Sequence, residues 1–353
     1  MHTFTRLASV AAVSALALLI NTSAQAQDIR PVAPAPASAP APSGAPGVAF
    51  SAKLVAAAAA FETYTGRAAT IKADFANAES VASALRAGSA YQSKQMQNGE
   101  IAFAAIVALQ DPDFVDGVRQ LARDPRAADI LINDPSTVTA VPGAQGAASR
   151  VGAALRDRGA KVLAVGQAVQ QSAYDIQHQP WSLAQVAAPQ ATLARSKALS
   201  AMEFAPAADD TARLIKLAAA APAAGRDDTM LAMPVVQRGM ALAALAVLGQ
   251  AGDGSEDRIA PLLVDNRGAD CMRMAKLNLY QCLAVAGPQY EDVFCLGQHA
   301  LMDTGQCVIA SATPRVARPA LPVTRTGWTQ ASASTGGAML IPVASVSKVA
   351  PQP

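Results

Sequence analysis

Hydrophobic residues follow a helical spacing across most of the region from residue 48 to residue 309. Apolar positions there recur three, four or seven residues apart, as they do along one face of an α-helix. The longest example covers 147–177, with apolar residues at Val151, Leu155, Val162, Val165, Val169 and Ile176. Alternating β-branched and aromatic runs, which are typical of strands, are scarce. The pattern predicts an all-α protein, a helical bundle of antiparallel helices.

Local signals divide the first half of this region. The three Asp-Pro pairs are Asp111-Pro112, Asp124-Pro125 and Asp134-Pro135. Asp can cap a helix, and Pro suits its first turn. We therefore expect short helices over 112–123 and 125–133 and a loop over 134–146. A longer helical stretch over 73–110 precedes them, with breaks favoured at Gly88 and Gly99.

Glycine recurs every seven residues within 147–177, at Gly152, Gly159 and Gly166. A stripe of small residues allows a second helix to approach closely, although each Gly costs about 1 kcal/mol of helix stability relative to Ala. The second helix could belong to another copy of the chain or to the same chain. Packing within the chain is the favoured interpretation.

The first 26 residues have the pattern of a secretory signal peptide. Arg6 precedes the apolar run Leu7–Ile20, and the cleavage pattern Ala24-Gln25-Ala26 follows. The run is shorter than the roughly 20 apolar residues that cross a membrane. We therefore expect a mature protein that begins near Gln27, is periplasmic or secreted, and has no integral membrane segment.

Low-complexity segments flank the expected domain. Residues 27–47 alternate Pro with small residues, and residues 310–353 mix Pro, Ser, Thr and Gly without any acidic residue. Neither composition can build a core, so a disordered linker and a disordered tail are expected. One helical domain is left over 48–309, with a candidate sub-boundary near 220–232.

Composition narrows the classes of function. Alanine, the strongest helix former, accounts for 84 of the 353 residues, and the formal net charge is only +2. A nucleic-acid partner is excluded because phosphate contacts need a strong basic surplus. Aromatic residues make up only 4%, which disfavours stacking platforms for sugars or bases. No Gly-rich phosphate loop is present, and no cofactor is expected.

The four cysteines follow the spacing C-x10-C-x12-C-x11-C. An even number in a secreted chain indicates disulfides. Gly287-Pro288 marks a turn between two helical stretches, 272–286 and 290–304. Folding the chain about this turn brings together two nested pairs, Cys282 with Cys295 and Cys271 with Cys307. The spacing predicts a disulfide-stapled αα-hairpin over 270–308.

The two helices of this hairpin have unequal cysteine steps. Eleven residues separate Cys271 from Cys282, about three helical turns, so one face carries both. Twelve residues separate Cys295 from Cys307, which overshoots three turns by about 120°. We therefore expect the return helix to fray or bend.

The block DCMRMAKLNLYQCLAVAGPQYEDVFCLGQHALMDTGQC, which begins at Asp270, resembles a C-terminal module of secreted, Ala-rich helical bacterial proteins. The resemblance covers about a tenth of the chain. It implies a four-Cys hairpin and no activity, cofactor or partner.

A metal site is the alternative use of the same block. Glu291, Cys295, His299 and Asp303 are four residues apart on one helix, but the short C-x2–4-C spacing of structural zinc sites is absent. Disulfides are favoured, no metal is expected, and His299 is expected to bond to Asp303.

One polar cluster interrupts the Ala-rich background, in the segment QQSAYDIQHQPW that starts at Gln170. On a continuous helix, Tyr174 and Asp175 would lie one turn from His178, and Asp175 could orient its imidazole. Ser172 and Trp181 could complete this candidate polar site. The alternative is an ordinary helix end, where His and Gln satisfy the last carbonyl groups and Pro180 stops the helix.

Catalytic signals are otherwise few. A hydrolase of an envelope polymer would need a Glu with a raised pKa in a cleft, and Glu100 is the one nominated position. No catalytic residue is assigned. The sequence favours a non-enzymatic helical protein that binds a protein partner, itself or an envelope component, or has a structural role. The alternative is a periplasmic hydrolase acting through Glu100 or the Asp175/His178 cluster.

Overall fold

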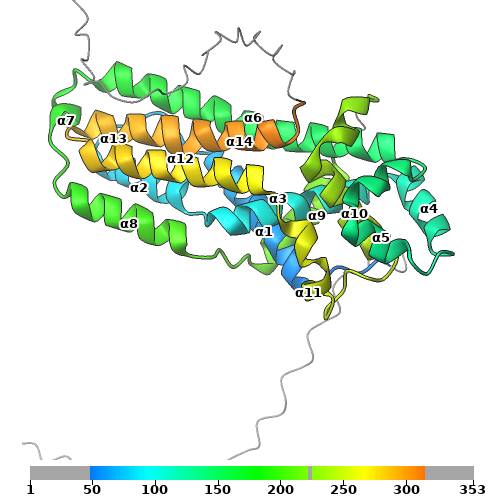
Figure 1. Ribbon diagram of the computed structural model, residues 1–353. Helices are drawn as coiled ribbons and strands as arrows, with labels where there is room; N and C mark the ends of the chain where they lie inside the picture. Colours follow the sequence, from blue (N-terminus) through cyan, green and yellow to red (C-terminus); the bar gives the residue numbers. More distant parts are fainter. Residues whose placement is uncertain (1–47, 222–224, 315–353) are drawn as a thin grey trace, which may run out of the picture. The chain divides into compact units, whose positions relative to one another are not determined.

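Helices form about three-quarters of the described chain, residues 48–221 and 225–314 of the computed structural model (Figure 1). Within these ranges no strand forms beyond two isolated β-bridges, so the all-α prediction is confirmed. The expected signal peptide, the linker over 27–47 and the tail beyond residue 314 lie outside the described residues. Residues 222–224, within the candidate sub-boundary, also lie outside them.

The α-helices of the described part are α1 (Ala52–Ala68), α2 (Ala78–Ser89), α3 (Ser93–Ala108), α4 (Pro112–Leu121), α5 (Ala127–Asn133), α6 (Ala144–Ile176), α7 (Pro180–Leu183), α8 (Pro189–Ala201), α9 (Ala208–Ala219), α10 (Pro234–Val247), α11 (Glu256–Ile259), α12 (Asn266–Val285), α13 (Gln289–Cys295) and α14 (Asp303–Ser311). Three short 3₁₀ segments are η1 (Pro135–Ala140), η2 (Asp228–Ala232) and η3 (Ala260–Leu263), and a π-helical segment, η4 (Leu296–Met302), joins α13 to α14. No helix in these ranges combines the length and the apolar character needed to cross a membrane.

Alanine-rich helices pack at the centre of the core, where α3 lies between α1 and α10. Every residue from Gly99 to Ala108 of α3 and from Gly239 to Ala246 of α10 is buried. Small side chains let these helices approach closely, so few aromatic residues are needed to fill the space. Phe61 and Phe103 are two of them, with ring centroids 5.4 Å apart.

The Asp-Pro expectations hold at two of the three pairs. The Asp111 carboxylate accepts a hydrogen bond from the Phe114 amide (3.1 Å) and begins α4. Asp134 similarly begins η1, a 3₁₀ turn inside the expected loop. The helix expected from residue 125 begins instead at Ala127, because the Asp124 carboxylate accepts from the Arg126 amide in a preceding turn.

The stretch expected to be helical over 73–110 contains two helices, the first of which begins only at Ala78, and neither expected break point is correct. The chain leaves the helix at residues 90–92, and Gly88 and Gly99 both lie within helices. At this break Tyr91 turns into the core, where it is 2% exposed. The Gln92 side chain then accepts from the Gln95 amide (2.6 Å) and caps α3. Burial of Tyr91 explains the break better than glycine does.

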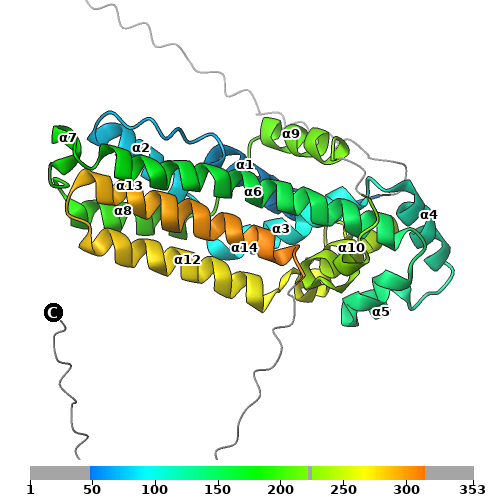
Figure 2. The same ribbon diagram turned by 90° about the horizontal axis from the view of Figure 1, so that it is seen from above.

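The glycine stripe of α6 packs inside the molecule, against the return helix of the cysteine hairpin. A Cβ at Gly159 would lie 2.7 Å from the Gly305 carbonyl oxygen, and one at Gly166 would lie 3.0 Å from that of Gly297. Both views show α6 beside α13 and α14 (Figures 1 and 2). The stripe therefore lets two backbones of the same chain approach closely.

The C-terminal helices form the expected hairpin, with α12 antiparallel to the continuous helix α13–η4–α14 (Figure 2). Disulfides join Cys271 to Cys307 and Cys282 to Cys295, with Cα atoms 5.7 Å and 5.6 Å apart. The disulfide-stapled αα-hairpin is therefore confirmed as part of the fold.

The expected fraying of the return helix is wrong, because α14 continues past Cys307 to Ser311. The helix instead widens into the π-helix η4 between Cys295 and Cys307. A π-turn closes i→i+5 hydrogen bonds and so takes up one residue more than an α-turn. With one residue taken up in this way, the twelve residues from Cys295 to Cys307 turn the helix as far as eleven α-helical residues would, about three turns. Both cysteines then face α12.

Candidate functional site

The polar segment that starts at Gln170 does not form a convergent site. Helix α6 ends at Ile176, before His178, so the one-turn relation assumed for Tyr174 and His178 is not present. His178 is exposed. Asp175 accepts instead from Gln171 (3.0 Å), within α6.

The other members of this segment also have separate partners. Tyr174 is 50% exposed and packs edge-on against Phe294. Trp181 donates to the Gln179 side chain (2.6 Å), and Ser172 donates to the Val169 carbonyl of its own helix. The segment has the features of a helix end, with Pro180 beginning the short helix α7.

Glu100 has the raised pKa expected of a general acid but is enclosed in the core. It lies on α3 and is 2% exposed. Burial raises the pKa of Glu100 to about 8; a hydrogen bond donated by Ser311 opposes the rise, and the Asp265 carboxylate adds to it. Ser311 and Asp265 line a cavity of about 510 Å³, but Glu100 does not belong to its lining.

Lys276 is another buried ionisable residue, and no sequence pattern predicted its burial. It is 5% exposed on α12 and donates hydrogen bonds to the Ser89 carbonyl and the Ser200 hydroxyl, both 2.7 Å long. Its ammonium nitrogen lies 3.4 Å from the Tyr91 ring centroid. Burial lowers the pKa of Lys276 well below its ordinary value. These contacts connect α2, α8 and α12.

His299 bonds to Asp303 as expected, with Nδ1 2.9 Å from the carboxylate. Asn278 and Gln298 donate to the same carboxylate. Among the described residues no group of three or more His, Cys, Asp or Glu side chains is arranged to hold a metal ion.

A cleft between α2 and α8 brings together polar side chains that the sequence did not suggest. Its volume is about 410 Å³. We call it the α2–α8 cleft; its lining comprises Ala78, Glu79, Val81, Ala82, Leu85, Val186, Ala187, Ala188, Ala191, Thr192, Arg195, Gln289 and Asp292. Small apolar side chains dominate this lining, and a few polar groups lie among them, as is usual for small-molecule sites.

Gln289 and Asp292 are the buried polar residues that α13 contributes to the cleft. They are 7% and 4% exposed, and neither side chain has a hydrogen-bond partner among the described residues. Their polar atoms are not among the fully enclosed side-chain atoms without a partner, which belong to Ser89, Arg150 and Arg238 in the described chain, so they reach the solvent of the cleft. Burial, followed by the charge of Glu291, raises the pKa of Asp292 to about 6. At neutral pH the cleft therefore contains a largely ionised carboxylate without a counterion.

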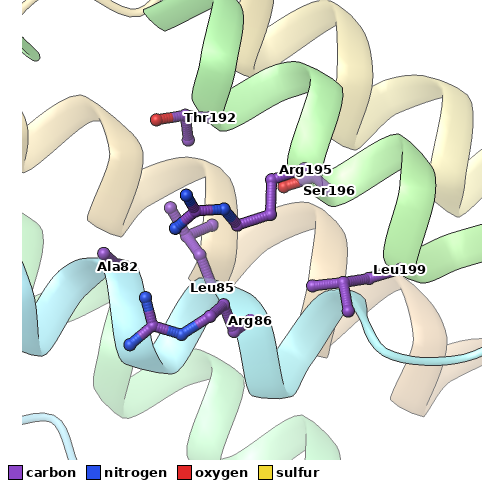
Figure 3. Close-up of a pocket in the computed structure, with 7 residues that line it drawn as sticks. All are labelled: Ala82, Leu85, Arg86, Thr192, Arg195, Ser196 and Leu199. Carbon is purple, nitrogen blue, oxygen red and sulfur yellow. The ribbon is translucent and has the colours of Figure 1, made fainter. Parts of the chain in front are cut away.

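Arg195 of α8 lines the cleft, whereas Arg86 of α2 lines a smaller neighbouring pocket. Arg86 on α2 pairs with Glu79 (2.7 Å), whereas Arg195 on α8 has no ion pair within the described ranges. Figure 3 shows both side chains in a smaller neighbouring pocket, with Leu85 and Thr192 beside them. Arg195 lines both hollows and is exposed.

The turn of the cysteine hairpin positions this cleft. The Val186 amide donates to the Gly287 carbonyl (2.8 Å), and the Gln289 amide donates to the Ala184 carbonyl (3.1 Å). These bonds attach the segment that leads into α8 to the start of α13. The Cys282–Cys295 disulfide fixes α13 to α12 within one turn of Asp292. The hairpin thus holds two sides of the cleft together.

No protein family, curated protein or solved structure matches this chain.

Proposed function

We propose that the protein is a non-enzymatic binding protein of the cell envelope, secreted to the periplasm or beyond, and that its ligand occupies the α2–α8 cleft. The observation that carries the proposal is the pair of buried side chains, Gln289 and Asp292, that line an open cleft without protein partners. A ligand that bonded to them would replace the water that these atoms reach in the cleft with direct partners.

The distribution of ionisable groups supports binding over catalysis. Lys276 and Glu100 have the displaced pKa values often found in active sites, but both are buried and engaged in hydrogen bonds. The cleft lining contains no Ser, Cys or His that could act as a nucleophile or base beside Asp292.

Secretion is supported by the signal-peptide pattern of the first 26 residues and by the pairing of all four cysteines. Disulfides persist in oxidising compartments such as the periplasm. A protein partner, another envelope component or a second copy of the chain, stays a prediction.

Thermal unfolding of the mature protein tests the proposal, with the small-molecule fraction of an envelope extract as added ligand. We expect the fraction to raise the melting temperature of the wild type, Glu100→Gln and His178→Ala alike, because neither substitution alters the cleft. A ligand present at about 100 times its Kd would add about 2.7 kcal/mol of stability. Absence of any shift in the wild type would contradict the binding function.

The raised pKa of Glu100 is the specific observation that favours the hydrolase alternative. The same variants test it through the release of soluble fragments from isolated envelope polymer. We expect no release by the wild type. Release that Glu100→Gln or His178→Ala abolishes, at an unchanged melting temperature, would establish the enzyme instead.

A further inference from the structure

The α2–α8 cleft contains two opposite charges that the protein does not pair with each other. Asp292 lies on α13 and Arg195 on α8, and both belong to the lining of the same hollow of about 410 Å³. No ion pair within 4 Å joins them or engages either one elsewhere in the described chain. The two opposite charges therefore line one cleft without an ion pair between them.

The surroundings of the two charges differ. Asp292 is 4% exposed and has Gln289 one turn away on the same helix, so a cation there would leave water and need direct partners. An ammonium group has three donors, enough for the Asp292 carboxylate and the Gln289 amide oxygen together. Arg195 is exposed and offers the planar fork of donors that suits a carboxylate.

We propose that the cleft binds a small zwitterion, an amino acid or short peptide, with its ammonium group at Asp292 and Gln289 and its carboxylate at Arg195. The proposal rests on the binding function proposed above and names the class of ligand. Val81, Ala82 and Leu85 of α2 line the same cleft, which favours small apolar side chains. The volume is in the range of ordinary small-molecule sites.

The other charged groups around Asp292 do not replace this ligand. Glu291 on the same helix accepts from the Gly287 amide (2.7 Å), and Glu79 on α2 pairs with Arg86. Asp292 has no ion pair within 4 Å in the described chain. Arg195 has none either, although its charge adds to that of Arg86 in lowering the pKa of Glu79.

Calorimetric titration with four probes tests the proposal at pH 7: L-alanine, L-alanyl-L-alanine, L-alaninamide, which lacks a carboxylate, and N-acetyl-L-alanine, which lacks an ammonium group. We expect L-alanine or the dipeptide to bind at least about tenfold more tightly than both one-charge probes, because each of the latter leaves one protein charge unpaired. Equal affinity for the zwitterions and either one-charge probe would overturn the proposal.

Substitutions assign each charge to its residue. Asp292→Asn should abolish the preference for an ammonium group, and Arg195→Gln should abolish the preference for a carboxylate. Each substitution should weaken the affinity for the zwitterionic probes by about tenfold or more. The matched control is Lys197→Gln on α8, which faces the Tyr280 ring and lies outside the lining. Its affinity should stay within about twofold of the wild type.

The pH dependence of dipeptide binding is a further readout. Affinity should fall below about pH 6 as Asp292 becomes protonated, and again above about pH 8 as the ligand amine loses its proton. A flat profile between pH 5 and pH 7 would exclude Asp292 as the cation's partner. If the envelope fraction stabilises the wild type but no zwitterionic probe binds, the zwitterion is wrong and the binding function stands.

Discussion

Three buried ionisable side chains of this protein differ in how the fold satisfies them. Lys276 donates two hydrogen bonds and lies over the Tyr91 ring, and Glu100 accepts from Ser311. Asp292 has no hydrogen-bond partner in the described chain, although it is almost as buried as Glu100. The core provides partners for the first two residues, whereas the proposed ligand would provide one for Asp292.

Glu100 should make the stability of the protein depend on pH, and its substitution by Gln should remove that dependence. Its folded pKa of about 8 lies above the ordinary value of 4.5, so the folded state binds more protons between these pH values. Stability therefore falls as pH rises through this window. Relative to the wild type, Glu100→Gln should be more stable at pH 9 than at pH 5, by on the order of a few kcal/mol.

Urea unfolding of both proteins at the two pH values measures this difference. Gln keeps an oxygen that can accept from Ser311, so the variant should fold. Parallel pH profiles would show that Glu100 is not the buried titrating group that the structure indicates.

At the scale of elements, a helical glycine should be essential where two helix backbones meet, as in α6, and dispensable where the space beside it is open. Gly166→Ala places a Cβ 2.7 Å from the Met302 amide nitrogen and should cost about 1–3 kcal/mol of stability, despite the better helix propensity of Ala. Gly66→Ala on α1 is the matched control, since its nearest contact is a side-chain oxygen 3.4 Å away.

We expect Gly66→Ala to be neutral or stabilising by up to about 1 kcal/mol. Thermal or urea unfolding of both variants gives the comparison. An equally benign effect of Gly166→Ala would mean that α6 and the return helix are not in close backbone contact.

The two disulfides should differ in what their removal changes. Cys271–Cys307 closes a separation of 36 residues and Cys282–Cys295 one of 13. In the chain-entropy model their removal costs about 4 and 3 kcal/mol. Replacing both cysteines of the outer pair by Ala should therefore lower the melting temperature by about 5–10 °C, and the inner pair slightly less.

Ligand binding should be weakened more by removal of the inner disulfide than by removal of the outer one, because the inner disulfide lies within one turn of Asp292. Melting curves and dipeptide titrations of the two double variants measure both effects. Greater loss of binding from the outer pair would contradict the role given to the hairpin turn.

At the scale of the whole molecule, sequence patterns predicted the structural features that depend on residues close together in the sequence. The period of α6, the caps at Asp111 and Asp134, and the cysteine hairpin all follow from spacing within one segment. The cleft does not, because α2, α8 and α13 come together only through long-range packing.

Residue type alone did not identify the site. The candidate polar site around His178 is distinctive in composition, yet its residues lie at a helix end with separate partners. Asp292 sits beside Glu291 in a segment that resembles an ordinary acidic first turn. Only its burial and the absence of a partner in the described chain distinguish it.

The mature chain should begin at or near Gln27. The expected result from intact-mass measurement on protein recovered from the periplasm or the medium is loss of residues 1–26, because signal peptidase cleaves after small residues such as Ala24 and Ala26. A retained N-terminus would contradict the secretory assignment and leave the binding cleft unaffected.

The most direct test of the central claim is the titration of the Asp292 side-chain carboxyl carbon by NMR, in the free protein and with saturating L-alanyl-L-alanine. In the free protein its pKa should be about 6, and the bound ammonium group should lower it toward or below the ordinary Asp value of about 3.9. An ordinary pKa in the free protein, or a pKa that the dipeptide leaves unchanged, would contradict the account.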